Sequence, residues 1–288
     1  LLAFMHPLGS GNTAAITASY ARHAFSNGFL QGYNTMDGLA ALAFGITIIT
    51  AIKELGIKKT RQVSIETAKS GFLGIAGVAI IYLALIWLGA TSLHQFKLAA
   101  NGGITLAQIS HHYLGTAGDA ILATLATITC MTSAMGLVIA FSQDFHRRFP
   151  KISYRTFLRI NCGLSFLFAN LGLDQIIAWS TPILMFLYPL AITLIILGLL
   201  SPIFKHDRLV YQITTALTLI PAFFDMLNAL PANLHDSQLL QTLLGFAQQY
   251  FPFFSLGFGW LTFGIAGLIL GLICHVLKVR KRLGLLSE

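Results

Sequence analysis

Apolar residues fall in long blocks along the chain, and the blocks are about as long as membrane-spanning helices. A helix that crosses roughly 30 Å of hydrocarbon at 1.5 Å per residue needs about 20 predominantly apolar residues. Seven such windows recur, and two of them are short or interrupted. They lie near residues 34–52, 71–93, 118–141, 157–173, 176–200, 209–230 and 253–276. The pattern predicts an all-α integral membrane protein with about seven transmembrane helices.

Composition and charge agree with a lipid bilayer as the surrounding medium. Only 10% of the residues are charged and 56% are hydrophobic, whereas soluble proteins average about 25% charged residues. The net charge of +8 could suggest nucleic acid as a partner. The basic residues, however, follow alternate windows, so we predict no nucleic-acid binding.

The same basic residues predict an orientation. All but Arg22 and Lys97 of the 18 Lys and Arg residues fall in four segments. These segments are 53–69, 147–159, 205–208 and 278–282. Because positively charged loops remain cytoplasmic, we expect the amino-terminal end to be exterior and the carboxy terminus to be cytoplasmic.

The first window opens with a polar cluster that an ordinary spanning helix does not tolerate. The cluster consists of Gly32, Asn34, Thr35, Asp37 and Gly38. A charged residue costs about 2.5–3.5 kcal/mol at the centre of a spanning helix, and each glycine weakens a helix by about 1 kcal/mol relative to alanine. We therefore predict a broken helix whose freed backbone faces a ligand. Alternatively, residues 28–38 form an exterior loop and the helix begins at Met36.

The third window carries a second group of polar residues. Thr132 and Ser133 are adjacent, and Thr129 precedes them by about one turn. Hydroxyl and carbonyl oxygens are the hard ligands that a small cation such as sodium prefers. The same hydroxyls could instead bond to their own helix, four residues back. Beside a broken helix, the pattern predicts one half of an ion site.

Small residues predict close helix packing in two other windows. Gly71, Gly74 and Gly77 recur every three residues in the second window, and the last window is also rich in glycine. The glycines of the last window are Gly257, Gly259, Gly264, Gly267 and Gly271. Such residues allow helix backbones to approach closely.

Two further features are interpreted as structural. Pro182 and Pro189 in the fifth window should kink that helix and act as hinges. Asp225 lies near the exterior end of the sixth window, where it could reach water or Asn228, and we expect a structural role for it.

Several runs make the chain resemble a known family. The most specific is GYNTMD at 32–37, within AFSNGFLQGYNTMDGLAALAFGI. The others follow in the family's order: YLALIWLGATS at 82–92, ANGG at 100–103, ATLATITCMTSAMGL at 123–137 and FLFANLGLDQIIAWSTPILMFLYPLAI at 166–192. The chain is similar to the bacterial branched-chain amino acid carriers, sodium-coupled importers of leucine, isoleucine and valine in the bacterial plasma membrane.

The resemblance implies a fold and a division of the chain. Such carriers have the LeuT-like five-plus-five inverted-repeat fold, so the seven windows correspond to helices 6 to 12. Residues 29–200 would form helices 6–10, the second inverted repeat, and 201–288 would form helices 11–12 and a cytoplasmic tail. Residues 1–28 would be an exterior connection after a truncated helix. We accordingly expect a carboxy-terminal fragment of a carrier.

The resemblance also implies the residues of a binding site. In this fold a broken helix 6 holds the zwitterionic substrate, and Tyr33 could close over its aliphatic side chain. The candidate substrate-binding residues are Gly32, Tyr33, Asn34, Thr35, Met36, Asp37, Gly38, Met131 and Gly136. Sodium, the coupling ion, would bind to Thr129, Thr132 and Ser133, and no other cofactor is expected.

Two other classes of protein remain as alternatives. A membrane enzyme or receptor with seven native spans should show paired carboxylates, a histidine-rich cluster or a nucleophile and base at membrane depth. At membrane depth we find only the isolated carboxylates Asp37 and Asp225, so we do not predict an enzyme. The other alternative is a transport-incompetent remnant that inserts into the membrane but binds nothing.

Overall fold

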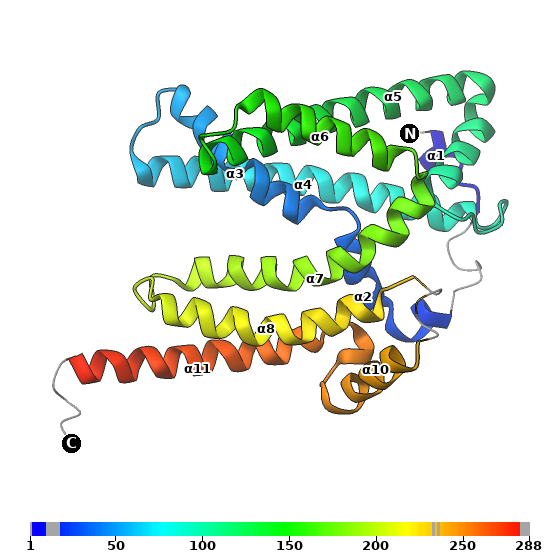
Figure 1. Ribbon diagram of the computed structural model, residues 1–288. Coiled ribbons are helices and arrows are strands. Elements are labelled where there is room, and N and C mark those ends of the chain that lie inside the picture. The colour runs from blue at the N-terminus through cyan, green and yellow to red at the C-terminus, as the bar shows by residue number, and fades with distance from the viewer. Residues whose placement is uncertain (1, 10–17, 232–233, 235–236, 283–288) are drawn as a thin grey trace. The chain divides into compact units, whose positions relative to one another are not determined.

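A computed structural model of the chain describes residues 2–9, 18–231, 234 and 237–282 (Figure 1). Regular structure within these residues is helical throughout, as the hydrophobic pattern predicts. The helices are α1 (Leu2–Met5), α2 (Ala18–Tyr33), α3 (Asp37–Glu54), α4 (Thr60–Ser92), α5 (Gly102–Arg148), α6 (Tyr154–Ala169), α7 (Leu173–Leu200), α8 (Arg208–Asn228), α10 (Gln238–Tyr250), the 3₁₀ helix η1 (Phe254–Leu256) and α11 (Gly259–Arg282). Residues 10–17 of the predicted exterior connection and residues 283–288 of the predicted tail lie outside the described residues.

Within the described residues, five helices are long and apolar enough to cross a membrane, namely α4, α5, α7, α8 and α11. The other two predicted windows correspond to α3 and α6. Helix α3 has 18 residues but includes Asp37, Lys53 and Glu54. Helix α6 has 16 residues, which extend only about 24 Å at 1.5 Å per residue. These two helices account for the short or interrupted windows of the hydrophobic pattern.

The chain forms two compact units, and each is described by itself. The first unit combines Leu1–Thr17 with Ala41–Phe166, and the second combines Ala18–Ala40 with Leu167–Glu288. Helix α3 therefore begins in the second unit and continues into the first. The second unit contains α2, α7, α8, α10 and α11.

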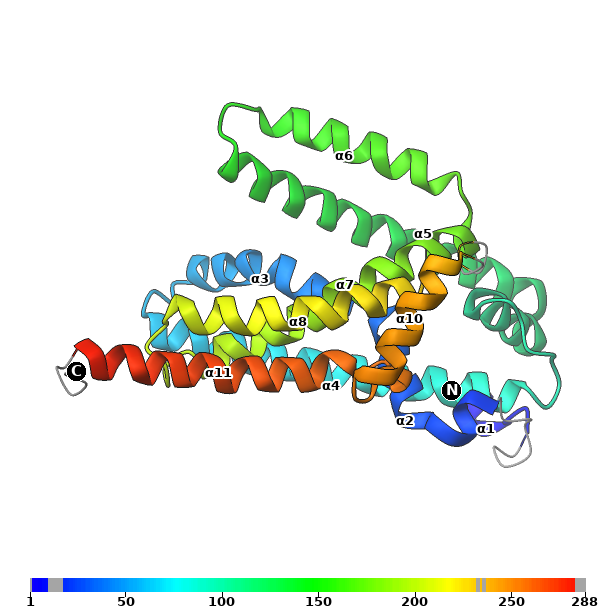
Figure 2. The same cartoon turned by 60° about the horizontal axis from the view of Figure 1, so that its bottom comes forward.

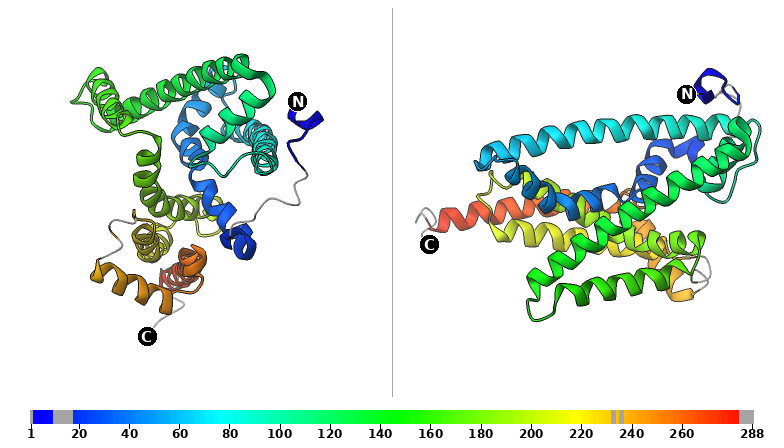
Figure 3. Two further views of the ribbon diagram at one scale, coloured as in Figure 1. Left: turned by 90° about the vertical axis from the view of Figure 1, so that its right-hand side faces the viewer. Right: turned by 90° about the horizontal axis from the view of Figure 1, so that it is seen from above.

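Three long helices form the body of the second unit. Helices α7 and α8 are antiparallel neighbours, and α11 returns along the other side of α8 (Figure 1). In the left view of Figure 3, α8 and α11 are seen nearly end-on, side by side. The face of α8 that carries Val210, Thr214 and Thr218 is buried. These residues recur every four positions, the spacing of one helix face.

Glycines of α11 allow its close approach to α8. A Cβ built at Gly267 would lie 2.8 Å from the Cα of Thr214, and one at Gly271 would lie 3.1 Å from the Cα of Val210. Only a residue without a side chain fits such a backbone contact. The predicted packing role of the glycines in the last window is therefore confirmed at these two positions.

Helix α10 and η1 form an apolar core near the carboxy-terminal end of α8 (Figure 2). Leu240, Leu244 and Ala247 are buried on one face of α10, and Phe251 and Phe254 complete the cluster. The spacing of three and four residues gives α10 one apolar face. This core packs α10 and η1 against α8 and α11.

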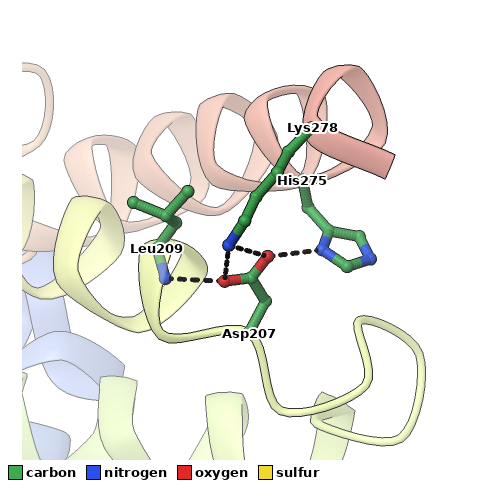
Figure 4. A network of polar contacts seen from close by, with 4 residues as sticks. All are labelled: Asp207, Leu209, His275 and Lys278. Carbon is green, nitrogen blue, oxygen red and sulfur yellow. Dashed lines mark hydrogen bonds and ion pairs between the residues drawn. The ribbon is translucent and has the colours of Figure 1, made fainter. Parts of the chain in front are cut away.

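A polar network ties α11 to the start of α8 (Figure 4). Asp207 caps α8, because its Oδ1 accepts a hydrogen bond from the Leu209 N–H at 3.2 Å. Lys278 Nζ lies 3.0 and 3.1 Å from the two carboxylate oxygens, and His275 Nδ1 lies 2.9 Å from Oδ2. The contacts with His275, Lys278 and the Leu209 amide hold the pKa of Asp207 well below its usual value. The network therefore stabilises the charged carboxylate.

The first unit is less tightly packed. Residues in the apolar window of α4 are not buried within the structure. A Cβ built at Gly71, Gly74 or Gly77 would meet no atom of the described residues within 4 Å. The predicted close contact of these glycines with another helix is therefore not confirmed. Helix α5 bends at Gly115, which has φ 58° and ψ −146° (Figure 2).

Candidate functional site

The predicted helix break lies between α2 and α3, and the structure confirms it. Helix α2 ends at Tyr33 and α3 begins at Asp37. The amides of Asn34, Thr35 and Met36 each bond to the carbonyl three residues earlier, at 3.0, 3.3 and 3.1 Å. Met36 has φ +59°, a left-handed conformation that costs most L-residues roughly 1–2 kcal/mol. The chain leaves the helical path at this residue.

The break is narrower than predicted. Gly32 lies inside α2, and Gly38 lies inside α3. The unwound segment is therefore residues 34–36, not the whole of 32–38. The alternative of an exterior loop over 28–38 is wrong for residues 28–33, which are helical. Its helix start at Met36 is one residue from the observed start of α3.

The polar side chains of the break make short-range contacts. Thr35 Oγ1 donates to the Gly32 carbonyl at 2.8 Å, and Asn34 Nδ2 donates to Gln31 Oε1 at 2.9 Å. Thr181 of α7 donates through Oγ1 to Asn34 Oδ1 at 3.4 Å. These bonds hold the turn closed on α2 and connect it to α7.

Tyr33 lies in an apolar core of the second unit. Its side chain is 3% exposed and stacks on Tyr188, with ring centroids 4.4 Å apart and planes within 4°. Leu184 completes this core. The Tyr188 ring also lies against the start of α3, where a Cβ built at Gly38 would meet its Cε1 at 3.2 Å. Whether Tyr33 closes over a substrate stays a prediction.

Thr181 and Tyr188 contact the helix break, and the sequence interpretation did not identify them. The prolines that follow them, Pro182 and Pro189, indicate only hinges in α7. The sequence signal that could have identified them is their spacing of seven residues, since residues two turns apart share a helix face. That face of α7 meets the break.

The remaining predicted site residues lie in α5 of the first unit. Met131, Thr132 and Ser133 are exposed, and Gly136 is half-buried beside the Phe44 ring of α3. Thr129 lies in the same exposed stretch of the helix. The predicted substrate residues 32–38 thus belong to the second unit, whereas Met131, Gly136 and the predicted sodium residues belong to the first.

The hydroxyl of Thr132 bonds to its own helix. Its Oγ1 donates to the Ile128 carbonyl at 2.8 Å, the arrangement expected for a hydroxyl without an external role. Thr124 and Thr127 make the same kind of bond, at 2.8 and 2.7 Å. The donated bond uses the hydroxyl proton and leaves oxygen lone pairs for a cation. The sodium role of Thr129, Thr132 and Ser133 stays a prediction.

These observations define a multi-pass membrane protein with a polar break between α2 and α3. A family model described as "Branched-chain amino acid transport protein" matches residues 1–278. The chain belongs to this family, which confirms the resemblance seen in the sequence. The family consists of transport proteins and not of enzymes.

The chain is similar over most of its length to curated permeases. It is 40% identical over 262 residues to the branched-chain amino acid permease BrnQ of Lactobacillus delbrueckii subsp. lactis, covering 91% of this chain and 58% of that protein. BrnQ of Bacillus subtilis is 35% identical over 279 residues, or 97% of this chain and 62% of the relative. BraB of Bacillus subtilis is 35% identical over 263 residues, or 91% and 58%. The chain thus spans about three-fifths of the length of these relatives, and no solved structure matches it.

Proposed function

We propose that this chain acts in the sodium-coupled uptake of leucine, isoleucine and valine across a bacterial plasma membrane. The proposal rests on membership of the transport family and on the names of its relatives, which are branched-chain amino acid permeases. The single structural observation that supports it most is the break between α2 and α3. Such breaks within apolar helices occur at the binding sites of secondary transporters.

The break has the chemistry to bind both ends of a zwitterion. The first amides of α3, from Asp37 onward, have no partners within the helix, and the helix dipole makes this end positive. The substrate carboxylate would bind there. The last carbonyls of α2 form a negative helix end, which would hold the ammonium group. The aliphatic side chain would lie beside the buried apolar core of Tyr33, Leu184 and Tyr188.

The finer topology is part of the same proposal. Helices α3 and α6 would complete seven spans with the five longer helices, in the arrangement of helices 6 to 12 of a five-plus-five inverted-repeat carrier. The basic segments between alternate spans support an exterior amino-terminal end and a cytoplasmic carboxy terminus. The oxygen atoms of Thr129, Thr132 and Ser133 would supply part of the sodium site.

The conformation of Met36 provides the test. Glycine adopts a positive φ without strain, whereas a β-branched residue is disfavoured there. We expect Met36→Gly to preserve uptake of radiolabelled leucine and Met36→Ile to reduce it by about tenfold, the equivalent of roughly 1.4 kcal/mol. The assay uses a bacterial strain without its own branched-chain amino acid uptake, at matched membrane levels of each variant.

Two results would contradict the proposal. If leucine uptake by cells that express the chain is no greater than in cells with an empty vector, transport by this chain is ruled out. Equal uptake by the Met36→Gly and Met36→Ile variants removes the break from the mechanism. A matched pair at Met135, an exposed residue of α5 that is not among the candidate site residues, controls for the loss of a methionine side chain.

A further inference from the structure

A buried carboxylate in α8 is not used by the proposed function. Asp225 is only 6% exposed, and its Oδ2 has no hydrogen-bond partner in the part of the chain that the structure describes. Burial of a charged group without a partner costs far more than burial of an amide or hydroxyl. Ionisable residues inside spanning helices therefore tend to mark sites for ions or substrates.

Asp225 lines a cavity of about 340 Å³ within the second unit. The other lining residues come from α2, α7, the end of α8 and the η1 segment. Four of them, Ser26, Asn27, Asn228 and Ser255, carry hydroxyl or amide oxygens. His23 is the other ionisable side chain in the lining, which contains no Lys or Arg. The described lining therefore carries one carboxylate and no permanent positive charge.

One lining residue has a backbone carbonyl without its usual helical donor. Met185 of α7 also lines the cavity. It lies four residues before Pro189, which has no N–H to donate, so the Met185 carbonyl lacks its usual helical donor. On the opposite wall, α2 is kinked at His23, where φ is −135° and ψ is 46°. Both helices thus depart from regular hydrogen bonding beside the cavity.

Neighbouring buried donors do not compensate the carboxylate. Tyr33 Oη and Trp260 Nε1, both in the second unit, are buried and also lack hydrogen-bond partners among the described residues. The described lining therefore supplies no positive charge for Asp225, and either a proton or a bound cation must neutralise the carboxylate. One carboxylate among neutral oxygens balances one positive charge, whereas calcium sites generally gather several carboxylates.

We propose that Asp225 binds a small monovalent cation in this cavity, with neutral oxygens of the lining as further ligands. An alkali-metal ion and the ammonium group of an amino acid share this chemistry. The site is separate from the proposed sodium site on α5, which lies in the first unit. It would add a cation-binding function in the second unit, where α2 leads from the cavity lining to the helix break.

The test measures cation binding directly and requires no transport. The full chain is purified in detergent at constant ionic strength with N-methylglucamine, which is too bulky for a site built around one carboxylate. Sodium, potassium, methylammonium or leucine is then titrated, and the thermal unfolding midpoint and the dissociation constant are measured. We expect at least one of these ligands to raise the midpoint of the wild-type chain, since a ligand that binds only the folded state stabilises it.

Asp225→Asn keeps the shape of the side chain and removes its charge, and should weaken that binding at least tenfold. Asp174→Asn removes a carboxylate from the exposed first turn of α7 in the same unit and should leave it unchanged. Asn228→Ala, which keeps Asp225, should weaken binding by a smaller factor and serves if Asp225→Asn does not fold.

The ligands distinguish the two sources of the cation. A response to sodium or potassium that depends on Asp225 assigns a metal ion, and a response confined to methylammonium and leucine assigns an ammonium group. The proposal is overturned if no ligand raises the midpoint, or if Asp225→Asn binds as tightly as the wild-type chain. Failure of leucine uptake in cells would not decide this question, because binding is measured on the isolated chain.

Discussion

Gly267→Ala in α11 tests the packing between α8 and α11. The added Cβ would lie 2.8 Å from the Cα of Thr214 and 3.3 Å from the Cβ of Leu217. Carbon atoms attract best at about 3.5–4.0 Å, so the two helices must separate by up to roughly 1 Å. Because the Thr214 Cα belongs to the backbone, rotation of a side chain cannot relieve the clash.

The expected magnitude follows from a matched pair of variants. Overpacking costs about 1–3 kcal/mol, whereas replacement of a helical glycine by alanine gains about 1 kcal/mol in helix propensity. Gly74→Ala in α4 has the same propensity gain, but its Cβ meets no described atom within 4 Å. The difference in unfolding free energy between the two variants should therefore equal the overpacking cost alone.

The measurement is thermal unfolding of the purified chain in detergent, followed by the helical circular dichroism signal. One kcal/mol corresponds to about 2–4 °C in chains of 150–250 residues, so Gly267→Ala should unfold several degrees below Gly74→Ala. Gly271→Ala, whose Cβ would lie 3.1 Å from the Val210 Cα, should also unfold below Gly74→Ala. If all three variants have the same midpoint, the α8 to α11 contact is not as close as described.

Two further outcomes are expected. The lowered pKa of Asp207 means that its stabilising effect is complete above about pH 4, the usual Asp pKa, and is lost as pH falls further. Thermal midpoints from pH 6 to 3 should therefore decline more for the wild-type chain than for Asp207→Asn. Parallel declines would show that the network does not favour the charged carboxylate. In an intact carrier that includes this region, alanine at both Thr132 and Ser133 should raise the half-maximal sodium concentration for leucine uptake about tenfold, equivalent to roughly 1.4 kcal/mol. Alanine at Thr124 and Thr127, which bond to their own helix in the same way, is the control. An unchanged sodium curve for the first pair would remove it from the ion site.

The existence of the helix break could be predicted from sequence, but its bounds could not. Two glycines and three polar residues within 32–38 indicate a weak helix. Gly32 nevertheless continues α2, since one glycine costs only about 1 kcal/mol within a helix that packs on its neighbours. The chain turns instead at Met36, with φ +59°. Methionine carries no sequence signal for that conformation, which tertiary contacts must enforce.

The glycine patterns show a similar limit. Gly71, Gly74 and Gly77 are at least as regular as the glycines of α11. A Cβ at any of these three would meet no described atom within 4 Å, whereas one at Gly267 or Gly271 would meet the backbone of α8. Small residues determine how closely a helix can be approached. They do not determine which helix approaches, because that depends on side chains far away in the sequence.

One face of helix α7 contacts the helix break, and the sequence predicts that face only in part. Thr181 and Tyr188 each precede a proline, and their spacing of seven residues brings them to the same side of the helix. Thr181 bonds to Asn34, and Tyr188 stacks on Tyr33 and lies against Gly38, so that side contacts both ends of the break. A proline removes one backbone donor and weakens the helix where it stands. The two prolines thus weaken α7 along the stretch that packs on the break.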